Sequence, residues 1–429
     1  MSIAFFWLFL VMMAVGIPVV FVLLLAPGIS LFLDGKMALY PQILSRLYNG
    51  MYSFPLMAIP FFILAGELMN SGGITRSLVL FAQSLIGHVR GGLAQVNILS
   101  SILFAGLSGS AVADTSALGS MLIPAMEKQG YTRRFAAAVT AASSVIGPII
   151  PPSGIMIIYA FIIKEVSPAG LFAAGIVPGL MVGIGLMLVT SYLAKKRNYP
   201  VAARKATWTE RGRAAKAAFW PLLTPVIILG GILGGIFTPT EAAGAAAGYA
   251  LILSLFVLRT VTFRELPAVL FRAAMASGVI MLLVGAAVAF AWVVTISGAP
   301  GIMTRFVLSI SDNPYILLFL INLLLLFIGM FLDAGPAILI LGPILSPIMA
   351  KLGVEPLHFA IVMCVNVTVG LATPPMGLVL FTAASISREK AEAIAIEMLP
   401  FLAVEIGVIF LITFIPALSL TVPRLLGFA

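Results

Sequence analysis

The chain has 429 residues, of which 62% are hydrophobic and 9% are charged, with a formal net charge of +9. Soluble globular proteins carry about 25% charged residues, so a cytosolic enzyme, a nucleic-acid-binding protein and a disordered regulator are excluded. Long apolar runs without alternation also argue against a transmembrane β-barrel. At ~20 residues for each helical crossing, we expect an all-α polytopic membrane protein with about 10–11 transmembrane helices.

The first predicted elements lie before the first glycine-rich stretch. The apolar run Ile3–Leu33 is interrupted at Gly16-Ile17-Pro18 and is either one long tilted helix or two short ones. A span is predicted at Met51–Met69, and within it Glu67 is expected to pair with a residue of an amphipathic arm. Ile74–Val89 carries a single apolar stripe, which is typical of an amphipathic helix in the membrane interface.

Two apolar pieces follow, Gly92–Gly109 and Ser110–Glu127, separated by a polar, glycine-rich stretch that contains Asp114. Irregular polar backbone is tolerated at membrane depth only where protein or a water-filled cavity covers it. We therefore predict a re-entrant helical hairpin at about 92–127.

A proline-rich interruption marks the next apolar stretch, Arg133–Ile163, which contains Gly147-Pro-Ile-Ile-Pro-Pro-Ser-Gly154. Prolines remove amide donors and break helices. The stretch 133–163 is therefore predicted to be two half-helices joined by unwound backbone. An ordinary span at Pro168–Leu193 follows it.

A strongly basic segment at 195–217 divides the chain. Only Glu210 opposes its eight basic residues, which are Lys195, Lys196, Arg197, Arg204, Lys205, Arg211, Arg213 and Lys216. Lysine and arginine accumulate in cytoplasmic loops beside anionic lipid, so the segment is predicted to be cytoplasmic.

The second half repeats this order of elements. Glu241 is expected to lie at a helix start, where it forms a capping box if Thr238 is the N-cap. A second hairpin is predicted at about 314–350, with Asp333 near its tip, and a second broken helix at 358–386. The remaining predictions are spans at about Phe219–Ile236, Thr240–Leu258 and Ala273–Ile296, an arm at Pro300–Ser311, an amphipathic stretch at Arg388–Leu399 and a last span at Phe401–Leu420.

An internal repeat relates the two halves, 1–194 and 218–429. An offset of 223 residues carries Pro124, Met126, Lys128, Gly130, Pro151 and Pro152 onto Pro347, Met349, Lys351, Gly353, Pro374 and Pro375. With small gaps, Asp114 maps onto Asp333. If Ile3–Leu33 is two helices, each half has an odd number of crossings, and the second half is inverted relative to the first. Paired, proline-interrupted segments in corresponding halves indicate a transporter binding site.

The hairpin tips and the two unwound loops form the candidate site. Freed carbonyls and hydroxyls suit a small hard cation, and helix N-termini favour a carboxylate. The candidate sodium ligands are Gly106, Ser108, Gly147, Ile150 and Ser153 in the first half and Gly329, Gly370, Thr373 and Met376 in the second. Asp114 and Asp333 are candidate substrate or coupling residues, or each caps the second helix of its hairpin. No catalytic site, no other metal and no cofactor is expected, and the pattern favours a cation-coupled carrier of anions.

Four motifs resemble those of the large membrane subunit of tripartite ATP-independent periplasmic (TRAP) transporters. They are Gly106-Leu-Ser-Gly-Ser-Ala-Val-Ala-Asp-Thr, Gly147-Pro-Ile-Ile-Pro-Pro-Ser-Gly, Phe237-Thr-Pro-Thr-Glu-Ala-Ala and Leu371-Ala-Thr-Pro-Pro-Met-Gly. The resemblance implies an elevator-type carrier of the ion transporter superfamily in a bacterial inner membrane. It also implies sodium-driven uptake of organic acids, with the sialic-acid branch favoured and C4-dicarboxylates as the other common class.

The same resemblance implies two partners, a small four-helix membrane subunit and a soluble periplasmic substrate-binding protein. Because the chain shows no N-terminal extension, we expect the small subunit to be separate. The closest alternative is a stand-alone sodium/dicarboxylate symporter of related fold. A channel is less favoured, because channels use rings of ligands and need no inverted pair of hairpins.

Overall fold

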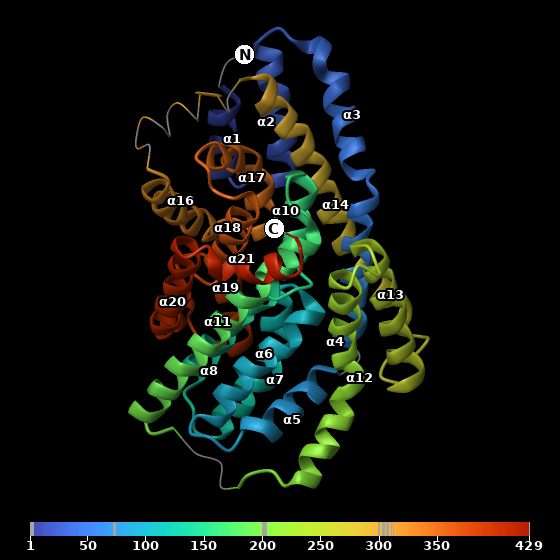
Figure 1. Ribbon diagram of the computed structural model, residues 1–429, viewed down its shortest axis with the longest axis vertical. Coiled ribbons are helices and arrows are strands. Elements are labelled where there is room, and N and C mark those ends of the chain that lie inside the picture. The colour runs from blue at the N-terminus through green and yellow to red at the C-terminus, as the bar shows by residue number, and fades with distance from the viewer. Residues whose placement is uncertain are drawn as a thin grey trace.

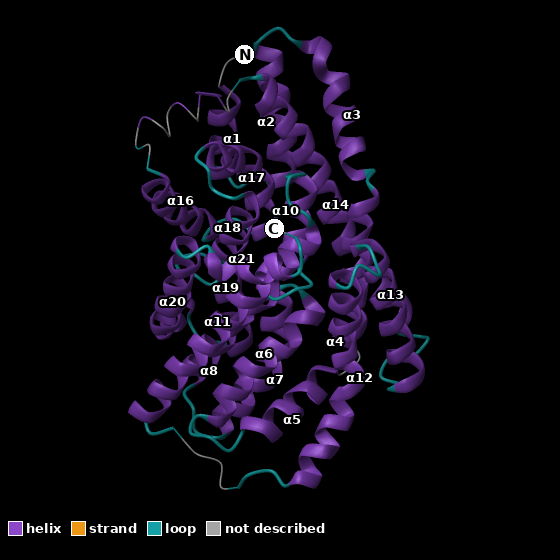
Figure 2. Cartoon of the chain, viewed as in Figure 1, coloured by secondary structure: helices purple, strands orange, loops and turns teal. Residues whose placement is uncertain are grey.

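The computed structural model describes residues 4–71, 74–199, 204–298 and 313–428, together with 301–302, 305, 309 and 311. Every regular element in these residues is a helix (Figures 1 and 2). Seven of the helices are long and apolar enough to cross a membrane, or eight if one bent pair counts as a span. The other predicted crossings correspond to shorter apolar helices, and the arm predicted at Pro300–Ser311 lies mostly outside the described residues.

The helices pack in two groups (Figure 1). We call the first the flanking group: α1 (Ala4–Ala14), α2 (Val19–Leu33), α3 (Tyr40–Met51), α4 (Ala58–Ser71), α12 (Trp208–Leu233), α13 (Pro239–Ile252) and α14 (Leu266–Ile296). Three short turns belong to it: η1 (Met37–Leu39), η2 (Phe54–Met57) and η3 (Leu253–Val257). Helix α5 (Ile74–Ile86) contacts both groups, through α12 and α6.

We call the second the hairpin group. Its first half consists of α6 (Gly92–Ser108), α7 (Ala111–Lys128), α8 (Arg133–Ser144), α9 (Ile146–Ile149), α10 (Gly154–Ile162) and α11 (Pro168–Lys196). Its second half consists of α16 (Pro314–Gly329), α17 (Ala334–Lys351), α18 (Pro356–Gly370), α19 (Leu378–Ser387), α20 (Ala391–Phe414) and α21 (Ala417–Leu425).

Helix α8 lies at the centre of the hairpin group. Each of its residues from Phe135 to Ser144 is buried, and most of them are small. Small side chains let helix backbones approach closely where lipid supplies no hydrophobic driving force between helices. Helices α6, α7, α19 and α20 therefore all pack directly on α8.

Buried polar side chains join each hairpin to the neighbouring broken helix. Asn97 of α6 donates a hydrogen bond to the Thr140 hydroxyl of α8 at 2.7 Å. In the second half, Asn366 of α18 donates to the Asn322 side chain of α16 at 2.7 Å, and Asn322 donates to Thr413 of α20 at 2.9 Å. Such bonds between membrane helices are worth about 0.6–2 kcal/mol each, so they fix the register of these contacts.

The N-terminal run is two helices rather than one. Gly16 has a φ of +85°, and Pro18 precedes the first turn of α2. The chain reverses there, because a positive φ suits glycine and the proline cannot continue α1. Helices α1 and α2 consequently pack against each other.

Two predictions of helix boundaries were wrong, and one helix was not predicted. Helix α20 runs through Pro400 without interruption, so the amphipathic stretch and most of the last predicted span are one helix. Membrane helices tolerate such prolines because neighbouring groups satisfy the freed carbonyl. Helix α12 begins at Trp208, well before the predicted Phe219, because Thr207 and Glu210 form a capping box inside the basic segment. Helix α3 was not predicted, since polar residues interrupt its apolar pattern.

Two acidic residues of the flanking group have structural partners. Glu241 and Thr238 form the capping box that the sequence predicted. Glu67 forms an ion pair with Arg272 of α14 at 3.1 Å, so the expectation of a partner on an arm was wrong. The pair joins α4 to α14, and the sequence could not reveal it because 205 residues separate the partners.

Both ends of the basic segment are anchored, but to different helices. The Tyr199 ring, just after α11, lies 4.7 Å from the ring of Tyr131 and 4.8 Å from that of Phe135 in the hairpin group. On the other side, Arg211 of α12 donates a hydrogen bond to the Ser84 carbonyl of α5 at 3.2 Å. The segment thus connects the two groups of helices.

Candidate functional site

The tip of the first hairpin lies against the first unwound loop. Gly109 ends α6 with a φ of 59°, and a Cβ placed on it would lie 3.1 Å from the Pro152 carbonyl oxygen. Ser110 is the N-cap of α7, where its hydroxyl accepts a hydrogen bond from the Ala113 amide at 3.4 Å. The Pro151-Pro152 peptide bond is cis, as is Pro374-Pro375 in the second loop.

Three of the predicted site residues gather around this first loop. A Cβ on Gly147 would collide with the carboxylate of Asp114, which is fully buried. A Cβ on Gly106 would lie 3.6 Å from the Pro151 carbonyl oxygen and 2.7 Å from Pro225 of α12. The backbone at Gly106 and Gly147 is therefore closely covered, and the carboxyl group of Asp114 lies beside Gly147.

The first loop also contains a buried hydroxyl without a partner. Ser153 stands at the N-cap position of α10, and its Oγ has no hydrogen-bond partner among the described residues. An unsatisfied buried hydroxyl is costly, and a ligand that it could coordinate would remove the cost. The side chain of Ile150 packs on Gly179 of α11, so Ile150 can contribute only its backbone. Ser108 ends α6, and its side chain lies outside the described residues.

In the second half, the structure brings Gly329 and Gly370 together. A Cβ on Gly370 would lie 2.5 Å from the Gly329 Cα, so the two backbones are in direct contact. Three residues later, the buried Thr373 hydroxyl donates a hydrogen bond to the Val369 carbonyl at 2.9 Å, which leaves its lone pairs available. The Met376 side chain is exposed, so only the backbone of Met376 is a candidate ligand.

The two acidic candidates occupy different positions. Asp333 is the N-cap of α17, and its Oδ1 accepts a hydrogen bond from the Ala334 amide at 2.8 Å. Asp114 instead lies in the first turn of α7, after the N-cap Ser110. The constant offset of 223 residues pairs Ser110, not Asp114, with Asp333. The mapping of Asp114 onto Asp333 was wrong, and the capping role holds for Asp333 alone.

Both hairpin tips and both unwound loops border a single central cavity of about 390 Å³. Gly109 and Ser110 come from the first tip, Pro152 and Gly154 from the first loop, Asp333 and Gly335 from the second tip, and Leu371 from the second loop. The opposite wall is apolar and belongs to the flanking group, with Ile59, Phe62 and Ile63 of α4 and Ile280 and Leu283 of α14. The cavity therefore lies at the boundary between the two groups.

Three helices begin at this central cavity. The first residues of α7, α10 and α17 line it, and their N-termini carry partial positive charge from unpaired amides. Asp333 neutralises the N-terminus of α17, since it caps that helix. Helix α7 carries Asp114 in its first turn, whereas the first turn of α10 contains no acid, so the start of α10 can receive a carboxylate.

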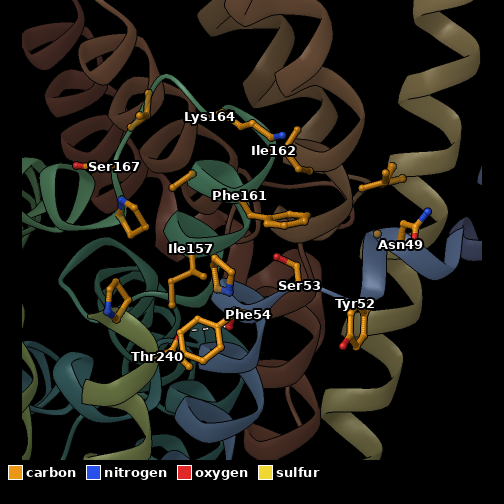
Figure 3. A pocket seen from close by; sticks show the side chains of 18 of the residues that line it. Asn49, Tyr52, Ser53, Phe54, Ile157, Phe161, Ile162, Lys164, Ser167 and Thr240 are labelled. Carbon is orange, nitrogen blue, oxygen red and sulfur yellow. Dashed lines mark hydrogen bonds between the residues drawn. The ribbon is translucent and has the colours of Figure 1, made fainter. Parts of the chain in front are cut away.

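A second, larger cavity has a volume of about 820 Å³. We call it the outer cavity, and like the central cavity it is lined by residues of α10 and α14. It is bordered by η2, by the far end of α10 and by α14 one turn beyond the central cavity, with the start of α13 closing one side. Ser53, Phe54 and Phe161 lie close together in it, and Thr240 donates a hydrogen bond to the Phe54 carbonyl at 3.2 Å (Figure 3). Lys164 and Arg46 place two positive charges on its lining.

The sequence reasoning missed one conspicuous residue, Glu405. It lies within α20, is fully buried, and neither carboxyl oxygen has a hydrogen-bond partner among the described residues. The signal was present, because Glu405 is the only charged residue inside the predicted span Phe401–Leu420.

Comparison with known proteins places this arrangement among transporters. Residues 6–418 match the family described as the DctM component of the tripartite ATP-independent periplasmic transporter. The sialic acid TRAP transporter large permease SiaM of Vibrio cholerae is 40% identical over 89% of this chain and 88% of its own length. The C4-dicarboxylate large permease DctM of Pseudomonas aeruginosa is also 40% identical, over 89% of each chain. The YdaH transporter of Alcanivorax borkumensis has a similar fold, with a TM-score of 0.63 and 17% identity over 89% of this chain and 88% of that one.

Proposed function

Because the chain belongs to the family of DctM components, the large permeases of TRAP transporters, we propose that it carries an organic acid through a bacterial inner membrane, coupled to sodium. The observation that supports this proposal best is the single cavity bordered by both hairpin tips and both unwound loops. That cavity offers helix N-termini to an anion, and the candidate sodium ligands among the described residues do not line it but belong to the hairpins and unwound loops that border it. The protein acts as a transport subunit and not as an enzyme.

The substrate carboxylate binds at the start of α10, which has no acid in its first turn. Asp333 lines the same cavity and can accept hydrogen bonds from substrate hydroxyls. A second carboxylate beside Asp333 would be repelled, whereas a polyhydroxylated monocarboxylate would not. This favours sialic acid over a C4-dicarboxylate. The two relatives with these substrates in their names are equally identical to the chain, so their identity does not distinguish the two acids.

Sodium occupies two related sites in this proposal. The first uses the backbone at Gly106, Gly147 and Ile150 with the unpartnered Ser153 hydroxyl, and the side chain of Ser108 is a further candidate. The second uses the backbone at Gly329, Gly370 and Met376 with the Thr373 hydroxyl. Asp114 lies beside the first site and lowers the cost of a bound cation there.

Transport follows an elevator mechanism in which the hairpin group moves against the flanking group. The halves 1–194 and 218–429 form the inverted repeat, and their re-entrant hairpins enter from opposite faces. The apolar wall formed by α4 and α14 supports such sliding, because it makes no polar contact that must break. The outer cavity, with Lys164 and Arg46, is the route by which the anion arrives.

The orientation of this arrangement can be tested at Glu165, just before α11, and at Thr209, in the first turn of α12. Helix α11 has 29 residues, about 44 Å, and leads into the basic segment. Cysteine at Thr209, in a Cys364→Ala background, is expected to resist a membrane-impermeant thiol reagent added to intact cells, while cysteine at Glu165 reacts. Both positions are exposed, and neither caps a helix. Ready labelling at Thr209 and protection at Glu165 would reverse the assigned orientation.

The partners of this carrier are a small four-helix membrane subunit and a soluble periplasmic substrate-binding protein. The purified chain alone is expected to take up little substrate in proteoliposomes under a sodium gradient, because the elevator needs an anchored flanking group and a loaded binding protein. Adding both partners restores uptake of sialic acid, and C4-dicarboxylate is assayed in parallel. Full uptake by the chain alone would instead identify a stand-alone sodium/dicarboxylate symporter.

A further inference from the structure

Glu405 is a buried acid that the proposed transport mechanism does not use. It lies near the middle of α20 and is completely inaccessible. Its neighbours one turn away, Phe401, Leu402, Val408 and Ile409, are buried hydrophobic residues. Neither of its oxygens has a hydrogen-bond partner, and it forms no ion pair among the residues that the structure describes. Its burial is complete within this one chain, so a partner subunit is not needed to cover it.

A charge in this position is costly. Placing an ionised acid at the centre of a membrane helix costs at least ~2.5–3.5 kcal/mol on insertion scales, and burial without a partner costs more. The chain must therefore neutralise Glu405 with a proton or with a bound cation. A hard cation gathers several oxygen ligands, whereas the side chains one turn from Glu405 on α20 are hydrocarbon, and no polar side chain of the described residues lies within hydrogen-bond distance of its carboxyl group.

The titratable groups around α20 do not neutralise Glu405. Helices α8, α11, α16, α18, α19 and α21 pack on α20. Apart from α19, which has none, they carry Arg133, Arg134, Tyr192, Lys195, Lys196, Tyr315, His358, Cys364 and Arg424. All but Cys364 lie near helix ends. Two of them have other partners: His358 contacts Ser419 at 2.7 Å, and Arg134 pairs with Glu389 at 2.9 Å.

Two further residues of α20 bracket Glu405 at about 12 Å along the helix on either side. Glu397 forms an ion pair with Arg197 at 2.6 Å. Thr413 accepts a hydrogen bond from Asn322 at 2.9 Å. Among the described residues, the polar side-chain contacts of α20 are thus made on either side of Glu405 along the helix, and none reaches it.

We propose that Glu405 is a proton-binding site that is occupied at neutral pH. Helix α20 packs on α8 of the first broken helix and on α18 and α19 of the second. A protonated Glu405 therefore leaves α20 uncharged where it contacts the two broken helices. At neutral pH the folded chain then holds a proton on Glu405, whereas Glu405 of the unfolded chain is ionised. Because the folded state binds more protons, its stability falls as pH rises. The consequence for transport rests on the proposed function, but the protonation does not.

Infrared spectroscopy of the purified full chain tests the protonation directly, without a transport assay. At neutral pH the wild type is expected to show the C=O stretch of a protonated carboxyl group, and Glu405→Gln removes that band. Glu392→Gln is the matched control, because Glu392 is an exposed acid on the same helix. A wild-type spectrum from which Glu405→Gln removes no such band would overturn the proposal.

Thermal unfolding between pH 6 and pH 9 gives an independent readout. The wild type and Glu392→Gln are expected to lose stability as pH rises, and Glu405→Gln to lose less, because its amide carries no titrating proton. An equal loss in all three proteins would contradict the proposal. If Glu405→Gln does not fold, the wild-type band alone decides, since it must fade as the pH is raised. If the band is present but sodium-driven uptake is absent, the proposed function fails while the proton site stands.

Discussion

Alanine at Gly370 is expected to reduce sodium-driven uptake by about 100-fold, although the substitution adds only one methyl group. The new Cβ would lie 2.5 Å from the Gly329 Cα and 2.7 Å from the Gly329 carbonyl carbon, well inside van der Waals contact. Both groups are backbone, so no side chain can move aside. Overpacking costs about 1–3 kcal/mol, and each 1.4 kcal/mol corresponds to about tenfold in population. The second hairpin and the second unwound loop are forced apart at the proposed sodium site.

The control for Gly370→Ala is Gly407→Ala on α20, where a Cβ meets nothing within 4 Å. Alanine is a better helix former than glycine by about 1 kcal/mol, so helix propensity favours both variants. Gly407→Ala should therefore keep wild-type uptake. Uptake is measured in proteoliposomes with both partners, and normalised to the amount of folded protein. Wild-type uptake by Gly370→Ala would show that the contact between the two glycines is not needed for transport.

Valine at Thr373 is expected to raise the sodium concentration for half-maximal uptake by about five- to 150-fold. The substitution keeps the branched shape and removes the hydroxyl oxygen. Losing one polar ligand costs about 1–3 kcal/mol, which gives that range. Protein abundance should change little, because the hydrogen bond from Thr373 to the Val369 carbonyl is only one of many that hold α18.

Thr382→Val provides a matched control for Thr373→Val. Thr382 makes the same kind of bond, from its hydroxyl to the Leu378 carbonyl at 2.8 Å, but it lies within α19 and not in the second unwound loop. If the effect of Thr373→Val came only from this local bond, both variants would behave alike. An unchanged sodium dependence with reduced abundance in Thr373→Val would remove Thr373 from the site.

Much of the fold follows from the pattern of apolar runs and their interruptions. Helices α6 and α7 meet within the glycine-rich stretch that the sequence singled out, and α9 and α10 flank Pro151-Pro152. These boundaries are predictable because proline and glycine act locally, through missing donors and backbone freedom. Pro400 is the exception. The same residue type leaves α20 continuous, because packing around a helix decides whether one lost hydrogen bond ends it.

The site was only partly predictable, because its contacts are made between distant segments. The sequence pointed to Gly329 and Gly370 separately, but not to their backbone contact. The sequence analysis paired Asp114 with Asp333 because both are acids, although the constant offset of the repeat pairs Ser110, the N-cap of α7, with Asp333. Glu405 was not predicted, because the candidate site was built from the motifs of the hairpin tips and the unwound loops. A lone acid in an apolar run nevertheless indicates a functional residue.

The anchoring of the basic segment at both ends sets a mechanical limit. Tyr199 is held among the aromatic rings of the hairpin group, while Thr207 begins α12 in the flanking group. The eight peptide steps from Tyr199 to Thr207 can extend to at most about 29 Å, whatever path the intervening residues take. The segment therefore limits how far Tyr199 and Thr207 can separate, and in the proposed elevator mechanism this length sets the longest possible movement of one group against the other.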